Sequence, residues 1–232
     1  GKYPVLKAHE VPDHIPKPGY ITKNEPFGVY EGVPTKNGPE KIKKLRKAGQ
    51  IARDAMVHAA QFVKEGATGE DVDKAIHDYI IAQGAYPTPI GFMGFPKSIC
   101  ISLNETLCHG IPSLQPFKSG DYVNLDCTVF YDGVHGDNSM MVTVGDVHED
   151  IRKLIKVTQG ALYEGIKICK PGVPFKNIGK VIQEYTNDHG YALCDLFNGH
   201  GIGDLLHMPP MIIHTYNTIP FIMEPGHVFT IE

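Results

Sequence analysis

The sequence feature that most constrains the fold is a turn dipeptide between two strand-like runs. Asp132-Gly133 separates two stretches that are rich in β-branched and aromatic residues. An Asp-Gly pair in this setting is the strongest short-range signal for a β-hairpin, because these residues tolerate the positive φ angles that the turn needs. The pattern therefore predicts two antiparallel strands, over about 121–131 and 134–144, joined by a two-residue turn.

The register of that hairpin would place two carboxylates on one face. With a two-residue turn, Asp126 lies opposite Ser139, and Asp137 is its diagonal neighbour on the same face. A β-bulge near Gly136 would shift this register, so that alternative stays open. The other face of the first strand is apolar and suited to a core, with Val123, Leu125, Cys127 and Val129. The polar face is either a site for chemistry or an ordinary solvated surface.

Composition excludes several classes of protein. The formal net charge is −4 over 232 residues, without long basic runs, which argues against nucleic acid as a direct partner. Five cysteines without a paired CxxC spacing fit a reducing compartment and give no zinc-finger pattern. No apolar run approaches the roughly 20 residues of a membrane span. We expect a soluble, cytoplasmic protein; because the chain begins with Gly rather than Met, organellar targeting by an upstream segment stays open.

The order of the predicted elements gives the fold class. Residues 1–39 are rich in Pro and Gly and are predicted to form an irregular N-terminal extension, followed by a domain over 40–232. Apolar residues at helical spacing predict helices over 40–66, 69–83, 150–168 and 175–189. Further strands are predicted over 98–104, 192–196, 211–214 and 227–232. Helices, strands, helices and strands in this order indicate an α+β fold with mainly antiparallel pairing.

The two helical pairs look like copies of one unit. Identical residues recur at a constant offset: Lys64, Gly66, Lys74, Ile76, Tyr79 and Gly84 match Lys170, Gly172, Lys180, Ile182, Tyr185 and Gly190. A duplication implies a pseudo-two-fold axis with the helix pairs around a shared, curved sheet, and ligand clefts favour such junctions. Chance similarity is the alternative.

Four side chains are candidate ligands for a metal ion. Asp126, Asp137, His200 and Glu232 each lie on or beside a predicted strand. Carboxylates and an imidazole without a thiolate suit a divalent ion such as Mn, Fe, Co or Zn, and two ions would relieve the repulsion among crowded carboxylates. His200 stands in Gly199-His200-Gly201-Ile202-Gly203, where glycines allow close backbone approach and positive φ. An ordinary loop histidine is the alternative for His200.

Several ordered motifs together resemble a known family. They are Asn124-Leu125-Asp126 with Asp137, Cys108-His109-Gly110-Ile111-Pro112, Gly199–Gly203 with His207, and Glu224-Pro225-Gly226 leading to Phe229-Thr230-Ile231-Glu232. From about residue 40 onward the chain resembles the type I methionine aminopeptidases, whose pita-bread fold is itself a pseudo-symmetric duplication. The short interval between His207 and Glu224 favours type I over type II. The Pro-rich opening is similar to the extension of eukaryotic-type members.

The resemblance implies a reaction and roles for single residues. It implies removal of the N-terminal initiator methionine from nascent proteins by attack of a metal-activated water on the first peptide bond. Asp126, Asp137, His200 and Glu232 would bind the metal ions, Co, Mn, Fe or Zn and two per chain. Glu232 would also act as general base, His207 would stabilise the oxyanion, and His109 would contact the scissile nitrogen.

The resemblance also implies a pocket for the methionine side chain. Its lining would comprise Phe92, Phe95, Cys100, His109, Leu206 and Pro89. Aromatic rings and a thiol suit a flexible thioether. Members of the family often have Phe where Leu206 stands, and Phe92 and Phe95 could instead be core residues.

One ligand of the family has no counterpart in this sequence. A second bridging Glu lies on a strand beyond Thr-Ile-Glu in the family, whereas this chain stops at Glu232. We expect that the C-terminal strand is missing because the sequence is cut short, since a sheet edge would otherwise stay unpaired.

Two other functions remain as alternatives. A proline-directed peptidase of the same fold shares the ligand set, although the Cys-His-Gly-Ile-Pro stretch favours methionine. A catalytically inactive binding module would keep the fold and lose its ligands. For the leading hypothesis we expect the N-terminal Met of nascent polypeptides as the substrate, association with the ribosome, no membrane and a monomeric protein.

Overall fold

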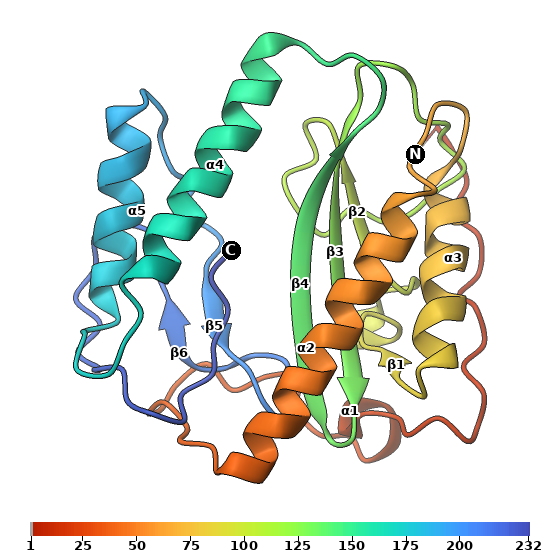
Figure 1. Ribbon diagram of the computed structural model, residues 1–232. Coiled ribbons are helices and arrows are strands. Elements are labelled where there is room, and N and C mark those ends of the chain that lie inside the picture. Colours follow the sequence, from red (N-terminus) through yellow and green to blue (C-terminus); the bar gives the residue numbers. More distant parts are fainter. Residues whose placement is uncertain (1) are drawn as a thin grey trace. The chain divides into compact units, whose positions relative to one another are not determined.

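The structure, a computed structural model, describes residues 2–232 (Figure 1). Gly1, the first residue of the predicted extension, lies outside the described residues. The chain divides into two compact units, which we describe separately. The first unit comprises the chain up to Phe27 together with Lys44–His148, and the second comprises Gly28–Lys43 with Glu149–Glu232. The predicted extension therefore contributes residues to both units.

The first unit combines helices with an antiparallel sheet. Its helical elements are α1 (Gly19–Thr22), α2 (Pro39–Ala60) from Lys44 onward, α3 (Gly69–Ala82) and a 3-10 turn η1 (Phe92–Gly94). Its strands are β1 (Tyr86–Pro87), β2 (Cys100–Leu103), β3 (Tyr122–Tyr131) and β4 (Val134–Thr143). The strand β3 is central, because β1, β2 and β4 all pair with it, each antiparallel.

The hairpin between β3 and β4 matches the prediction. Asp132 and Gly133 have φ angles of 49° and 84°, as a two-residue primed turn requires. The register runs without a break from Tyr131↔Val134 to Tyr122↔Thr143, so the alternative of a bulge near Gly136 is excluded. On the apolar face, Val123, Leu125, Cys127 and Val129 are fully buried, which confirms the predicted core of this strand.

Helix α2 lies with its backbone directly on β4 (Figure 1). A Cβ atom at Gly136 would come within 2.3 Å of the Ala48 carbonyl carbon, so only glycine fits there. The side-chain amide of Asn138 donates to the Gly49 carbonyl at 2.9 Å. These two contacts flank Asp137 and fix the part of β4 that carries it.

We predict that Gly136→Ala lowers the free energy of unfolding by about 1–3 kcal/mol, because the new methyl group must displace the α2 backbone. Gly49→Ala is the matched control, since a Cβ at Gly49 would meet no atom within 4 Å apart from the adjacent backbone of its own helix. Urea denaturation measures both. Equal stability of the two variants would contradict the close packing of α2 on β4.

The second unit is smaller. It contains α4 (Glu149–Lys167), α5 (Lys176–Asp188) and a two-stranded antiparallel sheet of β5 (Gly199–Gly201) and β6 (Met208–Ile212). The two helices and β6 enclose a core made of Ala161, Phe175, Ile178, Ile182, Ile212 and Met223. All named strand pairs in both units are antiparallel, which confirms the α+β class. Within residues 2–232, no helix has the length and apolar character that crossing a membrane would require.

Several predicted boundaries were wrong. The helix predicted over 40–66 ends at Ala60, because the next three amides bond to carbonyls three residues back and tighten the chain before Gly66. No strand forms over 192–196, where Leu196 is 77% exposed and the segment lies outside the described sheets. Over 227–232 the chain makes an isolated bridge, Gly201↔Phe229, rather than a strand.

Candidate active site

The first unit carries the two predicted aspartates. Asp126 on β3 lies opposite Ser139, and Asp137 on β4 lies opposite Thr128, so the two aspartates are the predicted diagonal neighbours on one face. Both are half-buried. Next to them, the Asn124 amide donates to Ser139 Oγ at 2.8 Å, which joins the polar faces of the two strands.

Cys100 lies beside the aspartates. It pairs with Asp126 across β2 and β3 and is 9% exposed. Burial, with the negative charges of Asp126 and Asp137, raises the pKa of the Cys100 thiol well above its ordinary value. Cys100 is therefore a neutral thiol, which presents a soft apolar surface rather than an anionic ligand.

The predicted pocket residues Pro89, Phe92 and Phe95 belong to one tightly turned segment. The Phe92 amide donates to the Pro89 carbonyl at 3.0 Å, and the Gly91 amide donates to the Phe95 carbonyl at 2.8 Å. Both phenylalanines are half-buried. They therefore lie at the edge of the unit rather than within its core.

Phe92 has aromatic partners that the sequence did not reveal. Its ring meets Tyr20 and Phe27 edge-on, at centroid distances of 5.5 and 5.1 Å. The Tyr20 hydroxyl donates to the Thr88 carbonyl. The one sequence feature that could have indicated these contacts is the presence of aromatic residues in an otherwise Pro- and Gly-rich extension. The extension thus supports the segment that carries Phe92.

His109 lies exposed in the loop after β2 and has a φ of 54°. The adjacent Gly110 ties this loop to β2, because its amide donates to Ser102 Oγ at 3.1 Å and its carbonyl accepts from the Ile101 amide at 2.8 Å. A Cβ at Gly110 would lie 2.1 Å from the Ile101 carbonyl oxygen. The glycine in Cys-His-Gly-Ile-Pro therefore permits close approach of two backbones.

The second unit carries His200 on β5 between two closely packed glycines. A Cβ at Gly199 would lie 2.4 Å from the Thr230 carbonyl oxygen, and one at Gly201 would lie 2.2 Å from that of Pro209. Close approach, as predicted, is therefore the reason for these glycines. Neither has the positive φ that was the other predicted reason.

His200 and Glu232 lie in contact. The His200 Nε2 and Glu232 Oε1 atoms are 3.2 Å apart, and His200 Nδ1 lies 3.1 Å from the Gly201 carbonyl oxygen. Because a carbonyl can only accept, Nδ1 carries a proton, and Nε2 is the nitrogen directed at the carboxylate. Neutral imidazole would then place a lone pair against an anionic oxygen. This arrangement fits a cation, either a proton on Nε2 or a metal ion.

Thr230 and His214, which no sequence motif indicated as site residues, hold Glu232. Thr230 Oγ1 donates to its carboxylate at 2.8 Å, and the Glu232 amide donates to His214 Nε2 at 3.2 Å. Partial burial would raise the pKa of the Glu232 carboxyl, but the hydrogen bonds and charge from His200 and Thr230 outweigh it and lower the pKa. Glu232 is therefore anionic. The alternation in Phe-Thr-Ile-Glu, which puts Thr230 and Glu232 on one side, could have indicated this contact.

His207 and Leu206 lie in the same unit. The His207 ring is perpendicular to that of His200, with centroids 4.4 Å apart. Leu206 is 8% exposed. Within the second unit, His207 therefore lies beside His200.

A second cluster of ligand-type residues lies in the first unit. Ligand atoms of His9, Glu70 and Asp73 lie within 4.8 Å of one another. The ammonium group of Lys97, fully buried, is 2.6 Å from Glu70 and 3.9 Å from Asp73. Glu70 also accepts the Leu6 amide at 2.9 Å. A lysine already supplies the cation here, so this cluster is an ion-pair network that holds the N-terminal segment.

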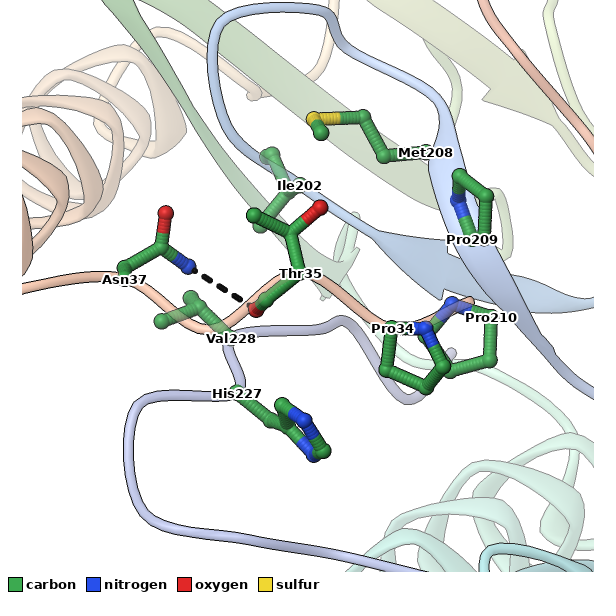
Figure 2. Close-up of a pocket in the computed structure, with 9 residues that line it drawn as sticks. All are labelled: Pro34, Thr35, Asn37, Ile202, Met208, Pro209, Pro210, His227 and Val228. Carbon is green, nitrogen blue, oxygen red and sulfur yellow. Dashed lines mark hydrogen bonds between the residues drawn. The ribbon is translucent and has the colours of Figure 1, made fainter. Parts of the chain in front are cut away.

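Figure 2 shows a small, shallow pocket in the second unit. None of the predicted site residues lines it. Among its lining residues, the Asn37 side-chain amide donates to the Thr35 carbonyl at 3.4 Å. The pocket is lined mostly by apolar side chains: Pro34, Thr35, Asn37, Ile202, Met208, Pro209, Pro210, His227 and Val228.

Comparison with known proteins points to one family. The profile of metallopeptidase family M24 matches residues 43–232. Methionine aminopeptidase 1B, chloroplastic, of Arabidopsis thaliana is 45% identical over 225 residues, which cover 96% of this chain and 60% of that protein. Methionine aminopeptidase 1D, mitochondrial, of Homo sapiens is 42% identical over 228 residues, covering 98% of this chain and 68% of the human protein.

The chain is also similar to a solved structure of a methionine aminopeptidase. The crystal structure of methionine aminopeptidase from Rickettsia prowazekii aligns with a TM-score of 0.83 and 36% sequence identity. The alignment covers 86% of this chain and 81% of the Rickettsia chain. The present chain spans about three fifths (60%) of the length of its plant relative.

Proposed function

Because the chain belongs to metallopeptidase family M24, among the type I methionine aminopeptidases, we propose that it removes the N-terminal methionine from polypeptides. Its fold is the pita-bread fold of that family. The observation that carries the proposal is the supported carboxylate of Glu232 beside His200, together with two aspartates on one face of the β3–β4 hairpin. The matched range 43–232 supports residues 40–232 as the catalytic domain, preceded by the extension 1–39.

Membership of a metallopeptidase family implies a divalent metal ion. We propose Asp126, Asp137, His200 and Glu232 as its ligands and Co, Mn, Fe or Zn as the ion, with two ions per chain. The donor set fits, since it offers carboxylate oxygens and one imidazole nitrogen, whose other nitrogen is held by a backbone carbonyl. Such an ion supplies acidity, lowering the pKa of water from about 15.7 towards about 7.

Residues of the chain would supply the general base, the oxyanion donor and the methionine pocket. Glu232 is anionic and is held by Thr230, so it can accept a proton from the attacking water as general base. His207 would donate a hydrogen bond to the oxyanion that develops on the first peptide carbonyl, and His109 would contact the scissile nitrogen. Pro89, Phe92, Phe95, Cys100, His109 and Leu206 would line the methionine pocket.

A panel of peptides tests the proposed function. With added Mn or Co, the protein should release Met from Met-Gly-Met but not from its N-acetylated form, because an exopeptidase of this kind needs the free α-amine. Xaa-Pro peptides should remain intact. Preferential cleavage of Xaa-Pro peptides would support the proline-directed alternative, and absence of cleavage in the whole panel would support an inactive binding module.

We predict that His207→Ala lowers kcat for Met-Gly-Met by about 10²-fold while the metal content stays unchanged, because one oxyanion donor is lost. His189→Ala is the matched control, since His189 is an exposed histidine on the same unit whose ring nitrogen Nδ1 lies 2.8 Å from the Tyr185 carbonyl oxygen. Steady-state kinetics and metal analysis give the answer. An unchanged kcat in His207→Ala would refute the role.

We further propose nascent polypeptides at the ribosome as the physiological substrate, a monomeric state, and the cytoplasm as the compartment. The names of the Arabidopsis and human relatives refer to the chloroplast and the mitochondrion, so those organelles are the alternative. Imaging of the tagged full-length protein distinguishes these compartments.

A further inference from the structure

Residues 28–30, which belong to the predicted extension, make a continuous set of contacts with His207. Gly28 forms a parallel bridge with His207, and the Val29 amide donates to the His207 carbonyl at 2.9 Å. The Tyr30 hydroxyl lies 3.1 Å from His207 Nδ1, and the two rings are inclined at 35° with centroids 5.7 Å apart. Both the backbone and the imidazole of His207 are therefore held by one short segment.

The close fit depends on Gly28. A Cβ at this position would come within 2.8 Å of His207 Cβ and 3.0 Å of the His207 carbonyl oxygen. Glycine therefore lets the segment approach near enough for the Tyr30 hydroxyl to reach the ring. The side chain of Tyr30 is otherwise poorly packed, because the residue is 57% exposed. Its hydroxyl contact with His207 is the specific interaction that the exposed ring makes.

The direction of this hydrogen bond is coupled to the tautomer of His207. A tyrosine hydroxyl is a good donor at neutral pH, and the unprotonated nitrogen of an imidazole is a good acceptor. When the hydroxyl donates to Nδ1, the neutral ring must carry its proton on Nε2. A donor to an oxyanion needs that proton, whereas the opposite tautomer would present a lone pair.

We propose that Tyr30 is a positioning residue that holds His207 in the tautomer with the proton on Nε2 and fixes the orientation of the ring. The effect on catalysis rests on the proposed function, in which His207 donates a hydrogen bond to the oxyanion. The assignment of the tautomer is independent of that function. The residue acts through His207 and does not need to touch the substrate. A segment that precedes the catalytic domain thereby contributes to the site.

The test uses Tyr30→Phe, which keeps the ring and removes only the hydroxyl. Long-range ¹H–¹⁵N correlation spectra of the ¹⁵N-histidine-labelled, Zn-loaded protein report which ring nitrogen carries the proton. Spectra are taken about two units above the ordinary histidine pKa of about 6.5, and the His207 signals are assigned by their loss in His207→Gln. Tyr216→Phe is the matched control, because Tyr216 is also 57% exposed and bonds instead to Glu184 at 3.0 Å.

We expect His207 to carry its proton on Nε2 in the wild type and in Tyr216→Phe, and to populate both tautomers in Tyr30→Phe. For Met-Gly-Met, Tyr30→Phe should lower kcat on the order of 2- to 10-fold, the range for one hydrogen bond, with KM unchanged. Identical His207 spectra in Tyr30→Phe and the wild type would overturn the proposal. A tautomer shift in a protein that releases no Met would uphold the positioning contact and reject the proposed function instead.

Discussion

Glu232→Gln is expected to lower kcat for Met-Gly-Met by about 10²–10⁴-fold, the range for loss of a general base. The amide nearly preserves the shape of the side chain, so Thr230 and His200 can remain in place. It cannot accept a proton from water, and it removes the negative charge that His200 and Thr230 stabilise. The metal affinity should fall as well, because a carboxylate ligand is lost. Steady-state kinetics at saturating Mn separates the loss of the base from the loss of metal.

Glu224→Gln is the matched control for this variant. Glu224 lies in the same unit and the same C-terminal stretch, but its carboxylate pairs with Lys36 at an exposed position. Exposed ion pairs contribute little, so kcat should stay within about 2-fold of the wild type. If Glu232→Gln kept more than about a tenth of the wild-type kcat at saturating Mn, its assignment as general base would be wrong.

Lys97→Met is expected to lower the free energy of unfolding by about 3–5 kcal/mol, the range for removing one partner of a buried ion pair. The Lys97 side chain is fully buried, 2.6 Å from Glu70 and 3.9 Å from Asp73. Burial raises the pKa of Asp73 to about 6, against the opposing effects of the Ser98 amide and Lys97. Without the ammonium group, two buried carboxyl groups would face each other without their cation.

Loss of the Lys97 ammonium group should also loosen the N-terminal segment. Glu70 accepts the Leu6 amide at 2.9 Å, and the Lys97 ammonium lies 3.4 Å from the Lys7 carbonyl oxygen. Hydrogen exchange of residues 6–10 should therefore accelerate in Lys97→Met. Lys74→Met is the control, because Lys74 pairs with Asp78 at an exposed position and should cost less than about 1 kcal/mol. Equal denaturation midpoints for the two variants would show that the buried ion pairs of Lys97 contribute no more to stability than the exposed pair of Lys74 with Asp78.

The hairpin was predictable because its signals are local. Asp132-Gly133 sets the turn, and the turn sets the register that places Asp126 opposite Ser139. The helices were predictable from apolar spacing, apart from the end of α2, where the apolar pattern continues through Phe62 and Val63 beyond the last helical hydrogen bonds.

The supporting contacts could not be predicted, because they join residues far apart in sequence. Nothing near Tyr30 indicates His207 as its partner, and nothing near Lys97 indicates burial beside Glu70 and Asp73. The strand β5, Gly199–Gly201, was missed as well, since three residues are too few for an alternating pattern. Such segments become ordered through tertiary packing, which a single sequence does not display.

The most direct test of the account is the metal dependence of methionine release. The protein is stripped with a chelator and titrated with Mn, and free Met liberated from Met-Gly-Met is measured by mass spectrometry as a function of bound metal. The account predicts no release from the stripped protein and release that rises with metal content. Release at the same rate with and without bound metal, or none from the loaded full-length protein, would contradict it.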